Sequence, residues 1–265
     1  MGPGTKRHAS DPDRSPTRAH LLDTIAVGRR SAVPKPETRA QLQDWDAHVA
    51  REEARYRDGE ARLTEPAPDD PSDPDSRQRQ LTRMGNAAGG AGLALLMARR
   101  RDEAAAWFVR AADRYRESFP HAPPGSWGRP IGAIKALVLA DDWPGAEQAA
   151  AWALEAGAAE ADSPIGGYAA ALALLVLGRD VDARVHADAI RIRDDFPRDV
   201  GDALAFIAAQ DVLGYAEAAD SVLESFERRE EYLEDIPVAD TVLVLQALAR
   251  RRDMDAELSS PLLPD

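Results

Sequence analysis

Cysteine is absent from this 265-residue sequence, and long apolar runs are absent as well. Without cysteine, the chain has no disulfide framework of the kind that secreted domains use, no thiolate zinc ligand and no cysteine nucleophile. The longest apolar stretch, residues 168–177, is far shorter than the roughly 20 residues that a membrane-spanning helix needs. The N-terminal residues are charged, and no apolar segment follows them directly as in a signal peptide. We therefore expect a soluble, cytoplasmic protein without a membrane partner.

Lysine and asparagine are scarce: the lysines are Lys6, Lys35 and Lys135, and Asn86 is the only asparagine. Two interpretations remain open. A GC-rich genome favours Ala, Gly, Arg, Asp and Pro codons whatever the protein does. A salt-rich cytoplasm favours excess surface carboxylate, because carboxylates keep the chain hydrated while salt screens their repulsion. The scarcity of lysine fits both interpretations, and the acid excess fits the second.

Basic residues are in the minority, since 33 Lys and Arg stand against 46 Asp and Glu and give a net charge of −13. Phosphate backbones repel such a chain, so we do not expect nucleic acid as a partner. The charge is unevenly distributed, because residues 1–63 carry +2 and residues 64–265 carry −15. The acidity therefore belongs to the part of the chain that is expected to fold.

Composition divides the chain into five regions. We predict a flexible N-terminal arm over residues 1–36, which are rich in Pro, Ser, Arg and Asp. Apolar residues at helical spacing predict a lone charged helix over 37–63, and the Pro/Asp-rich stretch 64–75 predicts an acidic linker. A helical-repeat domain over 76–258 and a C-terminal tail over 259–265 complete the chain.

Strand signals are nearly absent after residue 76, whereas Ala, Leu, Arg and Glu recur at steps of three and four residues. We therefore predict an all-α fold. The helices are expected over 76–99, 102–119, 130–140, 143–156, 164–177, 181–195, 197–210, 213–233 and 238–251.

These predicted helices pair off around similar junctions, which read MARRRDEAAAWF, VLADDWPGAEQA, VLGRDVDARVHA and AAQDVLGYAEAA. Aligning Ala104, Ala146, Ala183 and Ala216 gives spacings of 42, 37 and 33 residues, which are typical of helix-pair repeats. We expect a small residue in this column because the second helix of each pair must cross the first closely.

Over residues 76–234 the pattern resembles the tetratricopeptide repeat, most closely in VLGRDVDARVHADAI and RRDEAAAWFVRAADRY. The resemblance implies a right-handed stack of helical hairpins. Such a stack presents an extended surface, so we expect a non-enzymatic module that binds another protein or a peptide.

The C-terminal stretch 226–264, which ends in Ser259, Ser260, Pro261, Leu262, Leu263 and Pro264, resembles the close of the immunity protein 49 family of bacterial polymorphic toxin systems. This resemblance implies an alternative function, in which the chain binds and neutralises a cognate toxin. An acidic surface would suit a basic toxin.

Catalytic patterns are missing from the sequence. No two of the five histidines have the spacing that would pair them on one helix face, and the segment GNAAGGAG (85–92) follows no strand. We interpret that segment as a site of close helix packing. The carboxylate doublets at 141–142, 194–195 and 230–231 are interpreted as solubilising charge. We predict no catalytic, cofactor or metal residues, and keep a metal-dependent hydrolase that uses scattered carboxylates as a second alternative.

The loop over residues 119–130 is the candidate protein-binding surface. It brings Trp127, Arg129 and the nearby Lys135 together in an otherwise acidic protein, and aromatic and cationic residues are enriched in interface hot spots. The alternative is that Trp127 only fixes this loop to the helices. The other aromatic residues at helical spacing, Trp107, Phe108, Tyr115, Trp143 and Trp152, are predicted to lie in the core.

Overall fold

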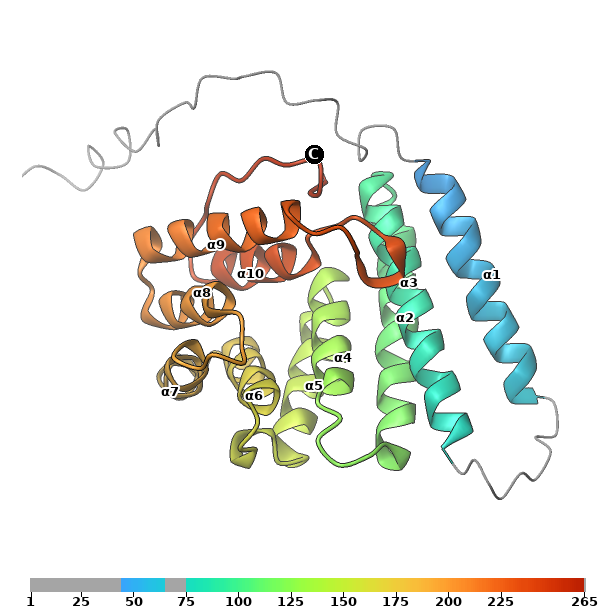
Figure 1. The fold of residues 1–265 in the computed structure, drawn as a ribbon, viewed down its shortest axis with the longest axis horizontal. Coiled ribbons are helices and arrows are strands. Elements are labelled where there is room, and N and C mark those ends of the chain that lie inside the picture. Colours follow the sequence, from blue (N-terminus) through green and yellow to red (C-terminus); the bar gives the residue numbers. More distant parts are fainter. Residues whose placement is uncertain (1–43, 65–74, 265) are drawn as a thin grey trace, which may run out of the picture. The chain divides into compact units, whose positions relative to one another are not determined.

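The computed structural model describes residues 44–64 and 75–264. Within these ranges every regular element is helical, which confirms the all-α prediction for this part of the chain (Figure 1). The α-helices are α1 (Trp45–Thr64), α2 (Ser76–Met97), α3 (Arg101–Ser118), α4 (Gly128–Leu139), α5 (Trp143–Glu155), α6 (Pro164–Val176), α7 (Asp180–Arg191), α8 (Arg198–Ala209), α9 (Val212–Glu227) and α10 (Asp240–Arg250). Three 3₁₀ turns accompany them: η4 (Phe119–His121), η5 (Ala158–Glu160) and η6 (Leu233–Asp235).

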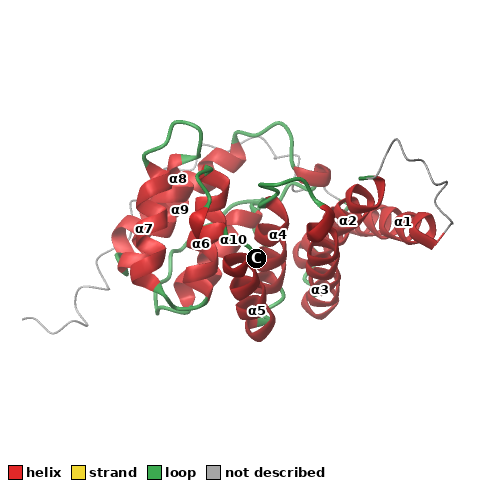
Figure 2. Ribbon diagram, turned by 90° about the horizontal axis from the view of Figure 1, so that it is seen from below, coloured by secondary structure: helices red, strands yellow, loops and turns green. Residues whose placement is uncertain are grey.

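Helices that follow one another in the sequence pack side by side, from α1 at one side of this unit to α7 and α8 at the other (Figures 1 and 2). Helix α10 contacts the preceding α9 and also returns to contact α4 and α8. Buried alanine and leucine side chains form one continuous core along the row. None of the described helices is long and apolar enough to cross a membrane.

Helix α1 is not the isolated helix that its charged sequence predicts, because it packs along α2. Val49 and Tyr56 are each only 5% exposed. The Tyr56 ring packs edge-on against the Trp107 ring with the centroids 5.3 Å apart. Arg114 Nε donates a hydrogen bond of 3.0 Å to the Tyr56 hydroxyl. Four buried positions of α1, namely Val49, Glu52, Tyr56 and Gly59, are therefore enough to attach it, although most of its surface is charged. The arm over 1–36 and nearly all of the 64–75 linker lie outside the described residues.

A similar turn joins α2 to α3, α4 to α5, α6 to α7 and α8 to α9. In each turn one residue adopts the left-handed conformation, and the next amide donates to a carbonyl five residues back, which closes the first helix. The left-handed residues are Arg99, Asp141, Gly178 and Gln210, with φ of 62°, 57°, 70° and 54°.

Counting from these turns corrects the predicted alignment at the fourth junction. The fifth residue after the left-handed position is Ala104, Ala146, Ala183 and then Tyr215, and all four are fully buried. Ala216, which the sequence alignment placed in this column, lies one residue later and is partly exposed. A small residue is therefore not required at every junction, since the fourth accommodates a tyrosine ring.

The end of α9 also differs from the prediction, because α9 stops at Glu227 and not at residue 233. The following segment turns away and buries Ile236 and Val238, which are 2% and 3% exposed. A continued helix would have kept the charged ladder of this segment in solvent, so burial of these apolar residues prevails over local charge pairing.

The predicted C-terminal tail is packed into the domain. Asp253 adopts the left-handed conformation after α10, but the residues that follow form no second helix. They run back along the domain instead, where Leu262 and Leu263 are 5% and 7% exposed. The Leu262 carbonyl accepts a hydrogen bond of 2.9 Å from the Ala239 amide, which fixes the tail beside the start of α10.

Arg252 ties the end of α10 to the turn between α6 and α7. Its guanidinium, only 7% exposed, pairs with Asp180 and donates a hydrogen bond of 2.7 Å to the Leu175 carbonyl. The neighbouring Arg251 stacks over Trp143 with its guanidinium carbon 4.2 Å from the ring centroid. A buried cation thus adds a second donor to a carbonyl at a helix C-terminus, which also accepts from the Gly178 amide, and pairs with a carboxylate at the next N-terminus.

We predict that Arg252→Ala lowers the free energy of unfolding by about 3 kcal/mol, because it leaves Asp180 without its cation and removes the hydrogen bonds to the Leu175 and Leu248 carbonyls. Urea unfolding followed by circular dichroism measures the change. The control is Arg250→Ala, whose guanidinium is 61% exposed and 3.7 Å from its carboxylate partner, and which should cost well under 1 kcal/mol. Equal losses in the two variants would contradict this role for Arg252.

The Tyr215 hydroxyl is buried and has no hydrogen-bond partner among the described residues. Burial raises the pKa of Tyr215 to about 12. We predict that Tyr215→Phe raises the free energy of unfolding by about 1 kcal/mol, because an unpaired buried hydroxyl is removed without creating a cavity. Tyr115→Phe is the matched control and should destabilise, since it breaks the 2.9 Å bond from the Tyr115 hydroxyl to Asn86 Oδ1. Urea unfolding measures both changes in the free energy of unfolding, and changes of the same sign in the two variants would contradict this account.

Candidate functional site

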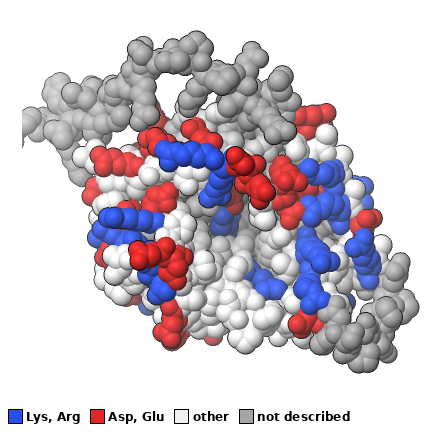
Figure 3. Space-filling model, in the orientation of Figure 1, with Lys and Arg blue, Asp and Glu red and all other residues white. Residues whose placement is uncertain are grey.

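A cleft of about 340 Å³ opens between α2, α3 and α4, and η6 and the start of α10 border it. Its volume falls in the range of ligand pockets. Figure 3 shows the surface hollowed at this place, with basic side chains gathered over α1 and α2 on one side and acidic ones over the segment after α9.

The glycine-rich segment of α2 forms one wall. A Cβ atom at Gly85 would lie 2.8 Å from the Tyr115 ring, and one at Gly92 would lie 2.7 Å from the Phe108 ring. These two glycines therefore permit the close packing of α3 that the sequence predicted. Gly89 differs, because a Cβ atom there would meet no atom within 4 Å. It lines the cleft, so part of the glycine segment leaves open space instead of filling it.

The two ends of the cleft differ in chemistry. Thr82 and Arg129 line one end, and Leu93, Phe108 and Leu139 line the other. Thr82 and Leu93 are eleven residues apart on α2, which at 1.5 Å per residue corresponds to about 16 Å. The cleft is therefore an elongated groove with a polar end and an apolar end.

Lys135 lies in the wall of the cleft and is already paired. Its Nζ is 2.5 Å from Asp240 Oδ2, and it also donates a hydrogen bond of 3.1 Å to Thr241 Oγ1. Burial alone would lower the pKa of Lys135, but the charge of Asp240 and their hydrogen bond outweigh it, so the pKa is raised. Lys135 therefore stays charged and joins α4 to α10.

Arg129 has neutral partners only. Its Nε donates a hydrogen bond of 3.0 Å to Ser118 Oγ, and Nη2 donates to Gln78 Oε1. No carboxylate of the described residues pairs with it. Burial accordingly lowers the pKa of the Arg129 guanidinium. The polar end of the cleft thus carries a positive charge that the described structure does not neutralise.

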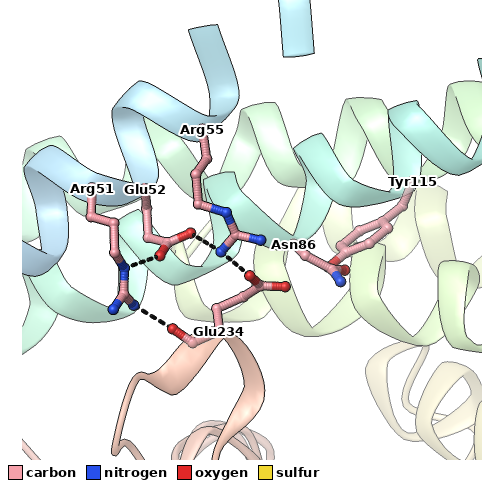
Figure 4. Close-up of polar contacts among 6 residues, drawn as sticks. All are labelled: Arg51, Glu52, Arg55, Asn86, Tyr115 and Glu234. Carbon is pink, nitrogen blue, oxygen red and sulfur yellow. Dashed lines mark hydrogen bonds and ion pairs between the residues drawn. The ribbon is translucent and has the colours of Figure 1, made fainter. Parts of the chain in front are cut away.

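Tyr115 and Asn86 place a hydroxyl and an amide in the same wall (Figure 4). The Tyr115 hydroxyl donates to Asn86 Oδ1 at 2.9 Å. Burial raises the pKa of Tyr115 well above its ordinary value, and the charges of Glu234 and Asp240 raise it further. The hydroxyl therefore stays protonated and keeps Asn86 oriented.

A cluster of two arginines and two glutamates holds η6 at the edge of the cleft (Figure 4). Glu52 of α1 is fully buried and accepts hydrogen bonds from Arg51 Nε at 2.7 Å and from Arg55 Nη1 at 2.8 Å. Arg55 also pairs with the Glu234 carboxylate, and Arg51 donates to the Glu234 carbonyl. Gly90 gives this cluster its room, because a Cβ atom there would lie 3.2 Å from Glu52 Cγ.

The backbone of η6 is strained where this cluster holds it. Glu234 and Asp235 both have positive φ, of 56° and 54°, in a region that residues with a Cβ atom rarely adopt. Since Glu234 also lines the cleft, α1 contributes to the shape of the site through this contact.

The structure separates the three predicted binding residues. Arg129 and Lys135 both line the cleft, although Lys135 is paired with Asp240. Trp127 does not line it: the ring is buried with its centroid 6.3 Å from that of Phe119, so it fixes the loop to the helices. The cleft therefore includes Ser126, Gly128 and Arg129 at the end of the predicted loop and continues along α4 to Leu139.

Sequence reasoning missed the other polar groups of the site, which are Glu52, Asn86, Tyr115, Glu234 and Asp240. The glycine-rich segment was the one available signal, because it marks where neighbouring helices approach α2. Nothing in the local sequence links Glu234 to Arg55, since these residues are 179 positions apart.

Residues of two of the three carboxylate doublets make contacts at turns or helix starts. Asp142 accepts a hydrogen bond of 3.0 Å from the Gly145 amide at the start of α5, and Asp195 pairs with Arg193 at 2.8 Å. Among the described residues, no group of three or more His, Cys, Asp or Glu side chains is placed to hold a metal ion. The metal-dependent hydrolase alternative therefore gains no candidate site in this part of the chain.

Comparison of the chain with protein-family models, with curated proteins and with solved structures gives no match. The resemblances to the tetratricopeptide repeat and to the immunity protein 49 family therefore stay predictions.

The buried Glu52 predicts a specific pH dependence. Burial raises the pKa of Glu52 above its ordinary value of 4.5, against the opposing effect of Arg51 and Arg55. The folded state therefore holds this proton more tightly than the unfolded state. The stability that it contributes is complete below the ordinary pKa and is lost as the pH rises through the folded-state pKa.

We accordingly expect the stability of the natural chain, relative to Glu52→Gln, to be greater at about pH 4 than at about pH 7. Urea unfolding at both pH values measures the difference. Glu53→Gln is the control on the same helix, because Glu53 pairs with Arg57 on the partly exposed face of α1. A relative stability of Glu52→Gln that does not change with pH would contradict the raised pKa.

Proposed function

We propose that this chain is a non-enzymatic, helical-repeat binding module, in which the cleft beside α2 holds a segment of another protein. In this proposal the helix pairs stack as right-handed hairpins in the manner of a tetratricopeptide repeat. The equivalent turns at Arg99, Asp141, Gly178 and Gln210 support the repeat. Helix α10 would then be the first helix of a further pair, whose second helix is replaced by the packed C-terminal tail.

The elongated cleft is the observation that carries the proposal. It combines apolar walls with a few fixed polar groups, which is the usual character of a binding site. Its polar groups are held in place by neighbours, as Tyr115 holds Asn86 and Asp240 holds Lys135. A partner segment would therefore meet a preorganised surface and would lose little free energy to side-chain ordering.

Neutralisation of a toxin is the second candidate function. The charge of −15 over residues 64–265 favours it, because an acidic protein attracts a basic partner by electrostatic steering. The two proposals differ in the contact surface: a basic toxin would meet the acidic exterior, whereas a bound segment would occupy the cleft.

Gly89→Leu tests the cleft directly. A leucine side chain at this position would extend into the open space of the cleft, and leucine is a better helix former than glycine, so the fold should be kept or stabilised. Peptides selected on the immobilised full chain from a random seven-residue phage library serve as probes, and fluorescence anisotropy measures their affinity. We expect Gly89→Leu to weaken binding by about tenfold or more, through loss of contacts and steric exclusion.

The control is Ala189→Leu, which adds the same side chain to an exposed position of α7, away from the cleft. Its affinity for the selected peptides should equal that of the natural chain. Failure to select any peptide, or equal binding by Gly89→Leu, would contradict the proposed function.

A further inference from the structure

We propose that the segment bound in the cleft is acidic, with a carboxylate side chain at Arg129 and a large apolar side chain about five residues away. This inference rests on the proposed function and names the chemistry of its partner. It runs against the charge of the whole chain, whose net value of −13 would favour a basic partner.

Charge balance at the cleft carries the first step. The cations of the cleft and its edge have carboxylate partners in Lys135 with Asp240 and in Arg55 with Glu234, but Arg129 has none among the described residues. Its two hydrogen-bond partners, Ser118 and Gln78, are neutral and buried. A carboxylate from a partner would complete this site with a charge-assisted hydrogen bond.

Arg83 adds a second positive charge beside the same end. It lies on α2 between Thr82 and Asn86, both of which line the cleft, and it is exposed. No ion pair joins it to any described residue. Figure 3 shows basic side chains along this side of the hollow. The surface at the polar end is therefore positive, although the folded part of the chain is acidic.

The apolar end of the cleft indicates the second side chain of the partner segment and its spacing from the acidic residue. Leu93, Phe108 and Leu139 line it, and they lie about 16 Å from Thr82 by the rise of α2. An extended peptide covers this distance in about five residues at roughly 3.3 Å per residue. A segment that places an apolar side chain among these residues therefore reaches Arg129 with an acidic residue about five positions away.

Selection from the random seven-residue phage library on the full chain is the first test. We expect the selected peptides to be enriched in a pair of residues, one Asp or Glu and one Leu, Ile or Phe, about four or five positions apart. Enrichment of basic peptides would overturn this inference, leave a binding function in place, and favour the toxin-neutralising alternative. If no peptide is selected but the chain self-associates and Gly89→Leu abolishes this, a second copy of the chain is the occupant and the inference is wrong.

A double-mutant cycle between protein and peptide is the second test. Replacing the acidic residue of a selected peptide by its amide should weaken binding to the natural chain about tenfold, and it should have little effect on binding to Arg129→Gln. Glutamine at this position can keep a donor to Ser118 in the place of Nε, while it removes the charge and the hydrogen bond of Nη2 to Gln78. Equal effects of the amide peptide on both proteins would overturn the inference, even though the cleft would still bind peptide.

Arg83→Gln keeps the test decisive if Arg129→Gln fails to fold. Its side chain is exposed and has no ion pair with a described residue, so the fold does not depend on it. Arg83→Gln should lower the affinity for the acidic peptide by about threefold and make binding less sensitive to salt. Arg198→Gln is the matched control, because Arg198 lies on α8 with its side chain 78% exposed, and it should leave affinity unchanged. Equal affinities for Arg83→Gln and Arg198→Gln would contradict the role of the positive end.

Discussion

The close approach of neighbouring helices to α2 is the constraint on which the rest of the site depends. Glycines within one segment of this helix receive the Tyr115 and Phe108 rings of α3 and the buried Glu52 of α1. Each of these contacts would lose its room if the glycine carried a side chain. A Cβ atom at Gly89 in the same segment would have no atom within 4 Å, and the open space beside this glycine belongs to the cleft. One short stretch of sequence therefore both attaches α1 and α3 and opens the surface between α2 and α4.

Charge is organised on two scales in this molecule. Over the whole chain acids exceed bases. Most ion pairs of the described residues are exposed, so they keep the surface hydrated and contribute little to stability. Two pairs join segments that are distant in the sequence: the buried Arg252 with Asp180 ties α10 to the turn after α6, and the half-exposed Arg55 with Glu234 holds η6 beside α1. Arg129 departs from both patterns, because it is partly buried and no carboxylate of the described residues pairs with it. That departure distinguishes the polar end of the cleft from the rest of the surface.

Periodicity was sufficient to predict the helical class and most helix positions, because each helix buries alanine and leucine at steps of three and four residues. It failed where distant segments decide the outcome. The charged sequence of α1 did not predict that this helix packs on α2. Helix α9 ends early because Ile236 and Val238 are buried in the core, and Tyr215 takes the position where alanine was expected. The candidate site was predicted in part, since Arg129 and Lys135 line the cleft but Trp127 lies in the core. The contact of Glu234 with α1 depends on the fold alone and left no local signal.

The central claim is that an acidic segment binds in the cleft beside α2. Amide chemical-shift mapping of the full chain during titration with a selected acidic peptide tests it most directly. The account predicts that the largest shifts fall at residues 82–93 of α2, 129–139 of α4 and 233–234 of η6, with small shifts on α7 and α8. Shifts centred on α7 and α8, with none along α2 and α4, would contradict it.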